Sequence, residues 1–234
     1  MKAIVLCAGR GTRLGDLTRG RPKALLSVGG RPLIVHTLEW LAAQGVTDVL
    51  INLHYLPEAI PEAVAGSADC GVRVHYAREE RLLGTAGTVR ENRAWIGDKN
   101  VLVVYGDIIT DQTLGPMIAK HSDDDADATL LVHSRVGSNS VVTLDEHGRI
   151  TAFTERPDHK DLVPVNSWVF SGVQVLNPRL VARIAGDAPL DLPRDIYAPL
   201  VNELALYGFP LSGRRVAVDS PSRLEEATIL FGSG

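Results

Sequence analysis

The sequence predicts an α/β fold in which a mainly parallel central sheet is followed by a smaller antiparallel part. In the first half of the 234-residue chain, apolar runs of strand length alternate with segments whose apolar residues recur at helical spacing. Such alternation is typical of parallel βαβ units with helices on both faces of the sheet. In the second half, short strand-like runs follow one another closely, which indicates antiparallel pairing.

The first half supplies the parallel strands and their crossover helices. The expected strands are residues 3–7, 49–53, 72–76 and 101–105, and the expected helices are residues 33–41, 57–64 and 89–96. The runs 3–7 and 101–105 are continuously apolar, as expected for strands that are buried on both faces. The helix at 33–41 lies between Pro32 and Gly45, residues that favour the start and the end of a helix.

The second half supplies the antiparallel part. The expected strands are residues 128–132, 141–144, 150–154 and 168–176, with two more near Leu206 and Val216. The turn Asp145-Glu146-His147-Gly148 joins two of them and predicts a hairpin. We expect helices at 178–184 and 196–204, and a last one from Arg223. No linker or repeat interrupts the pattern, so a single domain over residues 1–234 is expected.

Composition excludes several classes of protein. Hydrophobic residues make up 45% of the chain and the formal net charge is −4, which argues against disorder and against binding to nucleic acid or an anionic membrane. The two cysteines, Cys7 and Cys70, cannot build a disulfide framework, so we expect a reduced, cytoplasmic setting. The seven histidines show no paired spacing, which argues against a zinc site.

The loop after the first strand is the strongest functional feature. A buried strand that ends in Gly9-Arg10-Gly11 presents backbone N–H groups at its carboxyl end, where open α/β sheets bind ligands. Four arginines and a lysine lie in or near this loop, although the chain as a whole is acidic: Arg10, Arg13, Arg19, Arg21 and Lys23. The pattern favours a polyanionic small ligand. A solvated basic loop with ordinary turn glycines is the alternative.

Two familiar phosphate-binding loops fit poorly. In a Walker loop, Lys-Ser/Thr would follow the glycines, whereas Arg21-Pro22 follows Gly20 here. In a dinucleotide-binding fold the glycines open a helix, and an acidic residue about 20 positions later binds the ribose. Here Gly15, Gly20 and Pro22 interrupt the next segment, and no acidic residue occurs between Asp16 and Glu39.

The motifs resemble those of the sugar-1-phosphate nucleotidyltransferases, also called nucleotide-sugar pyrophosphorylases. The resemblance begins with Ala8-Gly9-Arg10-Gly11-Thr12-Arg13-Leu14 and Pro22-Lys23. It continues through Leu83-Gly84-Thr85-Ala86-Gly87, Tyr105-Gly106-Asp107, Phe153-Thr154-Glu155-Arg156-Pro157 and Val218-Asp219-Ser220-Pro221. It implies a Rossmann-like three-layer α/β/α nucleotide-diphospho-sugar transferase fold with a small antiparallel extension on the sugar side. A nucleotide-binding part of about residues 1–110 would precede a sugar-binding part of about 111–234.

The resemblance also implies a reaction and a set of roles. A nucleoside triphosphate and a sugar 1-phosphate would form a nucleotide sugar and pyrophosphate, with Mg²⁺ as cofactor. Arg13 and Lys23 would contact the reacting phosphates, and Asp107 and Asp219 would hold Mg²⁺. Backbone and nearby groups would bind the nucleotide at Leu6, Ala8, Gly9, Gly11, Thr12, Gly84 and Thr85. Glu155, Arg156 and Gly172 would bind the sugar phosphate. A homo-oligomer is possible.

The residues themselves agree with this metal assignment. Asp107 follows a buried strand and a glycine, and Asp219 follows the short strand near Val216, so both carboxylates can reach one edge of the sheet. Two carboxylates that meet phosphates are the usual way in which proteins hold Mg²⁺. An ordinary turn or helix-capping aspartate is the alternative for Asp107.

The sugar side departs most from the family pattern. Arg156 replaces a common lysine, Ser140 a common glycine, and Phe170-Ser171-Gly172 a common Asn-Ala-Gly. Uridylyl and thymidylyl members commonly carry a glutamine ahead of the Gly84 position, but no glutamine occurs between Gln44 and Gln112. The motif 83–87 is more similar to that of guanylyltransferases acting on mannose or heptose 1-phosphates, which favours GTP. A uridylyl or thymidylyl enzyme, or a non-catalytic sensing homologue, are the alternatives.

Overall fold

The computed structural model describes residues 1–9, 11–134, 140–156 and 167–232, and the side chains of Thr12 and Arg13 lie outside this description. The chain forms two compact units. The first contains Met1–Leu82, Val104–Thr113 and Gly213–Gly234, and the second contains Leu83–Val103 and Leu114–Ser212. The predicted division near residue 110 differs from these bounds and stays a prediction.

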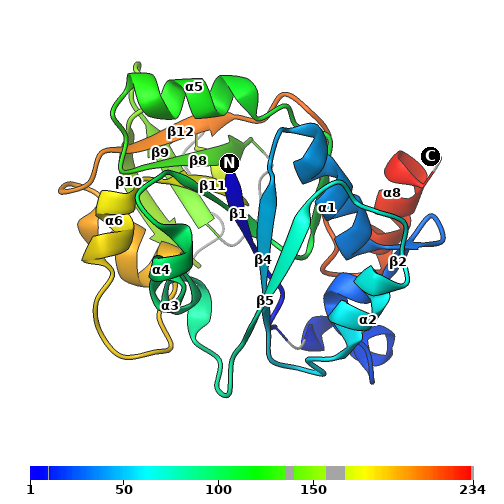
Figure 1. The fold of residues 1–234 in the computed structure, drawn as a ribbon. Helices are drawn as coiled ribbons and strands as arrows, with labels where there is room; N and C mark the ends of the chain where they lie inside the picture. The colour runs from blue at the N-terminus through cyan, green and yellow to red at the C-terminus, as the bar shows by residue number, and fades with distance from the viewer. Residues whose placement is uncertain (10, 135–139, 157–166, 233–234) are drawn as a thin grey trace. The chain divides into compact units, whose positions relative to one another are not determined.

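Three parallel strands form the sheet of the first unit (Figure 1). They are β1 (Lys2–Leu6), β4 (Asp48–Leu53) and β5 (Arg73–Arg78), in the order β1-β4-β5. Lys2 pairs with Asp48, and Asp48 with Arg73, so all three strands end at one edge. Ala3, Ile4 and Val5 have no exposed surface. The continuous apolar run of β1 is therefore explained by burial on both faces.

Short elements surround this sheet. The helices are α1 (Leu33–Ala43), α2 (Ala59–Ala65), α8 (Pro221–Phe231) and the one-to-two-turn segments η1 (Thr12–Thr18) and η2 (Lys23–Leu25). Two small antiparallel pairs join β2 (Ser27–Val28) to β3 (Arg31–Pro32) and β7 (Ile108–Thr110) to β13 (Arg215–Ala217). Leu14 of η1 packs in a core with Leu33, Val216 and Val218. The loop after β1 is therefore anchored in the core.

The second unit contains a mixed sheet and a separate hairpin. In the sheet, β8 (Ala128–His133) is parallel to β12 (Leu206–Pro210) and antiparallel to β11 (Val169–Leu176). The hairpin pairs β9 (Ser140–Leu144) with β10 (Ile150–Glu155), as the turn at 145–148 predicts. Strand β6 (Val101–Tyr105) starts in this unit and ends in the first.

Helices complete the second unit. They are α3 (Gly84–Glu91), α4 (Arg93–Ile96), α5 (Gly115–Asp123), α6 (Pro178–Arg183), η4 (Leu192–Tyr197) and α7 (Ala198–Leu200). Figure 1 shows α5 running along β8 and β12, and α6 beside α3 and α4. None of the helices of the described residues is long and apolar enough to cross a membrane.

Three helices differ from the prediction, each for a local reason. The helix expected at 89–96 begins at Gly84, because the Leu190 carbonyl accepts the N–H groups of Ala86 and Gly87 at 2.8 and 3.1 Å. Helix α5 was not predicted, since Met117 and His121 are its only buried side chains and give a weak pattern. The helix expected at 196–204 starts earlier, at Leu192, and ends at Leu200.

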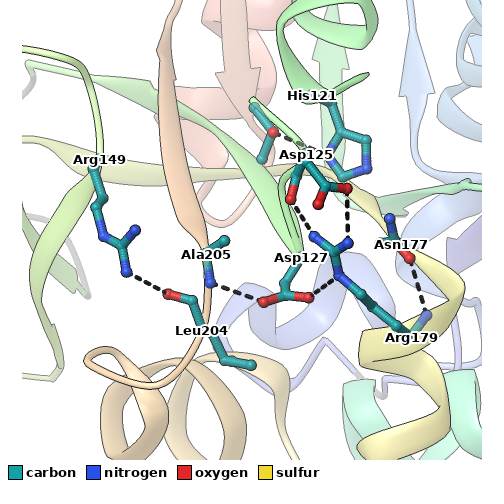
Figure 2. Close-up of polar contacts among 9 residues, drawn as sticks. His121, Asp125, Asp127, Arg149, Asn177, Arg179, Leu204 and Ala205 are labelled. Carbon is teal, nitrogen blue, oxygen red and sulfur yellow. Dashed lines mark hydrogen bonds and ion pairs between the residues drawn. The ribbon is translucent and has the colours of Figure 1, made fainter. Parts of the chain in front are cut away.

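An ion-pair network holds the start of β8 in the second unit (Figure 2). The Arg179 guanidinium lies between the carboxylates of Asp125 and Asp127, with Nη1 2.7 Å from Asp125 Oδ1. The other oxygen of Asp127 accepts the Ala205 N–H at 2.8 Å, so the network reaches β12. Asn177 caps α6 by accepting the Arg179 N–H at 3.0 Å. These contacts join the starts of β8 and β12, the end of β11 and the start of α6.

His121 is buried against the same network. Its Nδ1 lies 3.0 Å from Thr129 Oγ1, and only 1% of the residue is exposed. The pKa of His121 is lowered to about 4, mainly by burial and also by the positive charge of Arg179, against the opposing negative charges of Asp125, Asp127 and Asp124. The imidazole is therefore neutral at pH 7.

Candidate active site

In the first unit, Gly106 brings the chain after β6 against the end of β1. Its N–H donates to the Leu6 carbonyl at 3.0 Å. A Cβ at this position would lie 2.4 Å from Cys7 Sγ and 2.8 Å from Leu6 O, so no other residue fits without displacing backbone. The next residue, Asp107, is consequently held beside the carboxyl end of β1, the edge at which the sequence predicts ligand binding.

Lys23 and Asp107 form the central ion pair of this edge. Lys23 Nζ lies 2.7 Å from Asp107 Oδ2, and the two side chains are 16% and 34% exposed. Gly11 supports Lys23 from the loop, because a Cβ on Gly11 would lie 3.1 Å from Lys23 Cβ, and its φ of +65° favours glycine. Thr18 Oγ1 donates to the Gly11 carbonyl at 3.1 Å and fixes the loop from the other side. The partial exposure of the pair leaves it able to meet a ligand.

Asp219 is brought to the same place by β13. The N–H of Val218 donates to the Asp107 carbonyl at 2.8 Å, which continues the pairing of β7 with β13. Asp219 follows directly, and Ser220 then caps α8 by accepting the Arg223 N–H. The backbones that carry the two predicted metal ligands are therefore adjacent within the first unit.

This donor set fits Mg²⁺. The ion is usually bound through one or two carboxylates, with substrate phosphates and waters as its other ligands. Asp107 and Asp219 supply two carboxylates, and the described residues contain no group of three or more His, Cys, Asp or Glu side chains that could hold a metal without a substrate.

The other predicted residues of the first unit lie along the same loop. Leu6 ends β1, Ala8 is 7% exposed, and Thr12 and Arg13 begin η1. Gly9 is exposed, and a Cβ built there would meet no described atom within 4 Å. The fold itself does not require glycine at position 9, in contrast to position 11. The side chains of Thr12 and Arg13 lie outside the described residues, and so does Arg10.

Two polar residues at this edge were missed by the sequence analysis. Asn52, 3% exposed, accepts the Cys7 N–H at 2.6 Å and donates to Glu79 Oε1 at 2.8 Å. Glu79, 8% exposed, follows β5 directly. An asparagine inside the apolar run 49–53 was the available signal, but only glutamine was considered as a polar contact for the base.

Cys7 is not a nucleophile in this setting. Burial raises the pKa of its thiol well above the usual range, and the negative charge of Asp107 raises it further. Since the thiolate is the reactive form, a neutral thiol leaves Cys7 as a packing residue.

In the second unit, Gly84 and Thr85 hold a distant segment of chain. Gly84 has a φ of +76°, and a Cβ there would lie 2.3 Å from the Leu190 carbonyl oxygen. The Thr85 N–H donates to Asp191 Oδ1 at 3.2 Å, and Thr85 Oγ1 accepts the Leu192 N–H at 2.7 Å. The first N–H groups of α3 are thus bound by residues 190 and 191. The predicted role of Gly84 and Thr85 in nucleotide binding stays a prediction.

Glu155 lies at the end of β10, near charges carried by η4. Burial raises the pKa of Glu155, and the Asp191 charge adds to this effect, whereas Arg156 and Arg194 oppose it. Arg194 also pairs with Asp195 at 2.8 Å and Asp191 at 3.4 Å. Glu155 is therefore a half-buried carboxylate next to one arginine that the sequence analysis missed, Arg194.

Gly172 lies in the middle of β11. Its φ is +86°, and the pairing of β11 with β8 shifts between Phe170 and Gln174. Such a bulge needs a residue that adopts positive φ, which explains the glycine. Arg156, the third residue predicted to bind the sugar phosphate, also has a positive φ, +51°.

Comparison of the sequence with known proteins identifies relatives of this chain. The model of the family described as "Nucleotidyl transferase" matches residues 2–200. The mannose-1-phosphate guanyltransferase of Schizosaccharomyces pombe is 29% identical over 99% of this chain, and that of Debaryomyces hansenii is 31% identical over 99%. The chain spans 64% of the length of each of these two relatives.

Solved structures confirm the fold. HddC of Yersinia pseudotuberculosis superposes with a TM-score of 0.83 at 18% identity, over 98% of this chain and 99% of that one. A putative glucose-1-phosphate thymidylyltransferase of Bacillus anthracis gives a TM-score of 0.85 at 22% identity, over 100% and 96%. The predicted Rossmann-like α/β fold with a mainly parallel central sheet is therefore confirmed.

Proposed function

Because the chain belongs to the nucleotidyl transferase family, we propose that it transfers a nucleotidyl group from a nucleoside triphosphate to a sugar 1-phosphate and releases pyrophosphate. One observation carries this proposal. The Lys23–Asp107 pair, 2.7 Å apart, lies at the carboxyl end of β1. The hydrogen bond from the Val218 N–H to the Asp107 carbonyl places the backbone of Asp219 next to this pair. A cation and two carboxylates at one strand end suit phosphoryl chemistry, which depends on positioning and charge neutralisation.

The protein's own groups act on the phosphates. A phosphate oxygen of the sugar 1-phosphate attacks the α-phosphorus in line with the departing pyrophosphate, so no covalent intermediate on the protein is needed. Lys23 neutralises charge on the reacting phosphates, and Arg13 stabilises the pyrophosphate as it leaves. Asp107 orients Lys23 through its Oδ2 and offers its carboxylate, with that of Asp219, to a metal ion. When bound there, Mg²⁺ supplies Lewis-acid stabilisation of the phosphate oxygens.

The remaining predicted residues bind the two substrates. Leu6, Ala8, Gly9, Gly11 and Thr12 contact the nucleotide along the loop after β1, and Gly84 and Thr85 contact it from the start of α3. On the sugar side, Glu155 accepts hydroxyl groups, Arg156 contacts the phosphate and Gly172 leaves room for the sugar. Burial raises the pKa of Glu155 because it disfavours the charged carboxylate. Hydrogen-bond donors such as sugar hydroxyls would stabilise that carboxylate.

GTP is the proposed nucleotide. The relatives named as mannose-1-phosphate guanyltransferases support it, and so does the lack of a glutamine between Gln44 and Gln112. A site that matches guanine leaves buried polar groups unpaired when uracil or thymine enters, at about 1–3 kcal/mol for each group. We therefore expect kcat/KM for GTP to exceed that for UTP or dTTP by about tenfold or more.

A substrate screen tests the proposal. Pyrophosphate release is measured with GTP, ATP, UTP, CTP and dTTP against a panel of hexose and heptose 1-phosphates in the presence of Mg²⁺. We expect release that needs both substrates and is fastest with GTP. A higher rate with UTP or dTTP would overturn the guanylyl assignment, and no release with any pair would overturn the transferase.

A further inference from the structure

Thr18 is a buried polar residue in a loop whose neighbouring residues are exposed. It is 5% exposed, whereas Leu17 before it and Arg19 after it are both exposed. Its hydroxyl oxygen lies 3.1 Å from the Gly11 carbonyl oxygen and 3.2 Å from that of Gly15. Because a hydroxyl has a single hydrogen to donate, the two carbonyls share it. Thr18 therefore joins the two ends of the turn from Gly11 to Gly15.

This turn is not held by regular helical hydrogen bonds throughout. Gly15 has a φ of 55° and a ψ of −124°, which interrupts η1 at the end of the turn. Leu14 donates its N–H to the Gly11 carbonyl at 3.0 Å, and its side chain, 4% exposed, anchors the turn in the core. Arg13 directly precedes Leu14, so its backbone belongs to the turn that Leu14 and the Thr18 hydroxyl hold.

Thr18 also contacts the segment that carries Lys23. Its carbonyl accepts the N–H of Arg21, two residues before Lys23, at 3.3 Å. A Cβ built on Gly11 would lie 3.1 Å from both Thr18 Cγ2 and Lys23 Cβ, so the Thr18 methyl group and the Lys23 stem both flank Gly11. A single residue thus connects the turn of Arg13 with the segment of Lys23.

This connection matters for the phosphates, because charge stabilisation in a transition state needs groups that are already in place. A misplacement of about 1 Å can cost about 100-fold in rate. Resting on the proposed function, we propose that Thr18 is a positioning residue, which holds the backbone at Arg13 in place against the segment of Lys23. Thr18 contacts no substrate, and it acts through its hydroxyl on the turn and through its methyl group beside Gly11.

Two substitutions separate the hydroxyl from the methyl group. Thr18→Val keeps the shape of the side chain and removes the hydroxyl, and we expect kcat for pyrophosphate release to fall by about tenfold while KM for the nucleotide changes by less than about twofold. Thr18→Ser keeps the hydroxyl, so both constants stay within about twofold of those of the wild-type chain. Thr37→Val is the matched control, because it removes a buried hydroxyl that donates to the Leu33 carbonyl at 3.1 Å inside α1, and it leaves kcat unchanged.

Combination with Arg13→Ala distinguishes positioning from general stability. If Thr18 acts through Arg13, Thr18→Val lowers kcat by less than about twofold in the Arg13→Ala chain, because the group that it positions is absent. Assays below the unfolding midpoint of every variant keep loss of folded protein out of this comparison. An equal loss of kcat in both backgrounds would make Thr18 a purely structural residue and overturn the proposal, as would an unchanged kcat in Thr18→Val alone.

Calorimetric binding of inorganic pyrophosphate in the presence of Mg²⁺ gives a second readout that needs no turnover. Pyrophosphate carries the charge that develops on the leaving group, so we expect Thr18→Val to weaken its binding by about tenfold in the wild-type chain and by less than about twofold in the Arg13→Ala chain. This pattern without release of pyrophosphate from any substrate pair would contradict the transferase and support the role of Thr18. Turnover in which the two substitutions act additively would support the transferase and overturn the role of Thr18.

Discussion

The two compact units use the same kind of sequence feature, a glycine followed by polar residues, for different purposes. In the first unit, Gly11 and Gly106 allow close packing that leaves Lys23 and Asp107 paired and partly exposed at the end of β1. In the second unit, Gly84 allows the chain to pack closely against Leu190, and Thr85 forms hydrogen bonds with Asp191 and Leu192. The same kind of motif therefore positions charged groups at a strand end in the first unit and joins two segments of chain in the second unit.

We expect substitution of Asp107 or Arg13 in the first unit to reduce activity without unfolding the chain, whereas substitution of Gly84 in the second unit reduces stability. The largest effect is expected for Asp107→Asn, because the change removes a charge that holds Lys23 and a metal ligand. We expect kcat/KM to fall by roughly 1,000-fold, about 4 kcal/mol of transition-state stabilisation, with an unchanged unfolding midpoint.

Asp111→Asn is the matched control for Asp107→Asn. Asp111 pairs with Arg214 at 2.6 Å in the same unit and has no proposed catalytic role, so its variant keeps its activity. Full activity of Asp107→Asn, or activity that is indifferent to EDTA, would contradict the assignment of the two carboxylates.

The next largest effect on activity is expected for Arg13→Ala. The charge on departing pyrophosphate grows in the transition state, so kcat is expected to fall by about 100-fold, near 3 kcal/mol, and KM for the nucleotide by far less. Steady-state kinetics measure both. Arg19→Ala, which removes an exposed ion pair with Asp16, is the control and changes neither. A change confined to KM would make Arg13 a uniform binder.

Gly84→Ala tests the structural role of this glycine in the second unit. The new Cβ would lie 2.3 Å from the Leu190 oxygen at a φ of +76°, so we expect a loss of about 3 kcal/mol in the free energy of unfolding. Gly97→Ala is the matched control in the same unit, since Gly97 has a φ of +80° with no described atom near the new Cβ. Its cost should be about 1–2 kcal/mol, measured by chemical denaturation. Equal costs would show that Leu190 moves freely.

The smallest effect is a pH dependence of the second unit. Since burial holds the pKa of His121 at about 4, the unfolded chain binds a proton below pH 6.5 that the folded chain does not. Stability therefore falls as the pH is lowered, by about 2 kcal/mol between pH 7.5 and pH 5. The difference between the wild-type chain and His121→Gln in denaturation at both pH values measures it. The same loss in both proteins would assign it to other groups.

The sequence predicted the elements whose apolar pattern is strong. Strands β1 and β6 contain continuous apolar runs, and β4 contains an apolar run interrupted by Asn52; the positions of all three were predicted within one residue. Helix α5 was missed because a helix with one buried face of two residues has little periodicity. The early start of α3 was missed because its first hydrogen bonds go to Leu190, about a hundred residues later in the chain.

The residues of the candidate site were also predicted only in part. Motifs along the chain located Lys23, Asp107 and Asp219, whose adjacency follows from strand ends that meet at one edge. The pairing of Asn52 with Glu79 depends on strand register and on side-chain direction, which no spacing in the sequence encodes, although a buried asparagine in β4 marks it. The pairing of Arg194 with Asp191 and Asp195 is local in sequence, but its place near Glu155 depends on the fold.

In the proposed reaction, the groups of the first unit direct attack on the α-phosphorus of the nucleotide. Incubation of the chain with mannose 1-phosphate, Mg²⁺ and GTP labelled either at the α- or at the γ-phosphorus tests it directly. We predict that the α-label appears in a nucleotide sugar and the γ-label in pyrophosphate, in equal amounts, and that both are lost in Asp107→Asn. Release of the γ-label as orthophosphate, or an α-label that stays in GDP, would contradict the account.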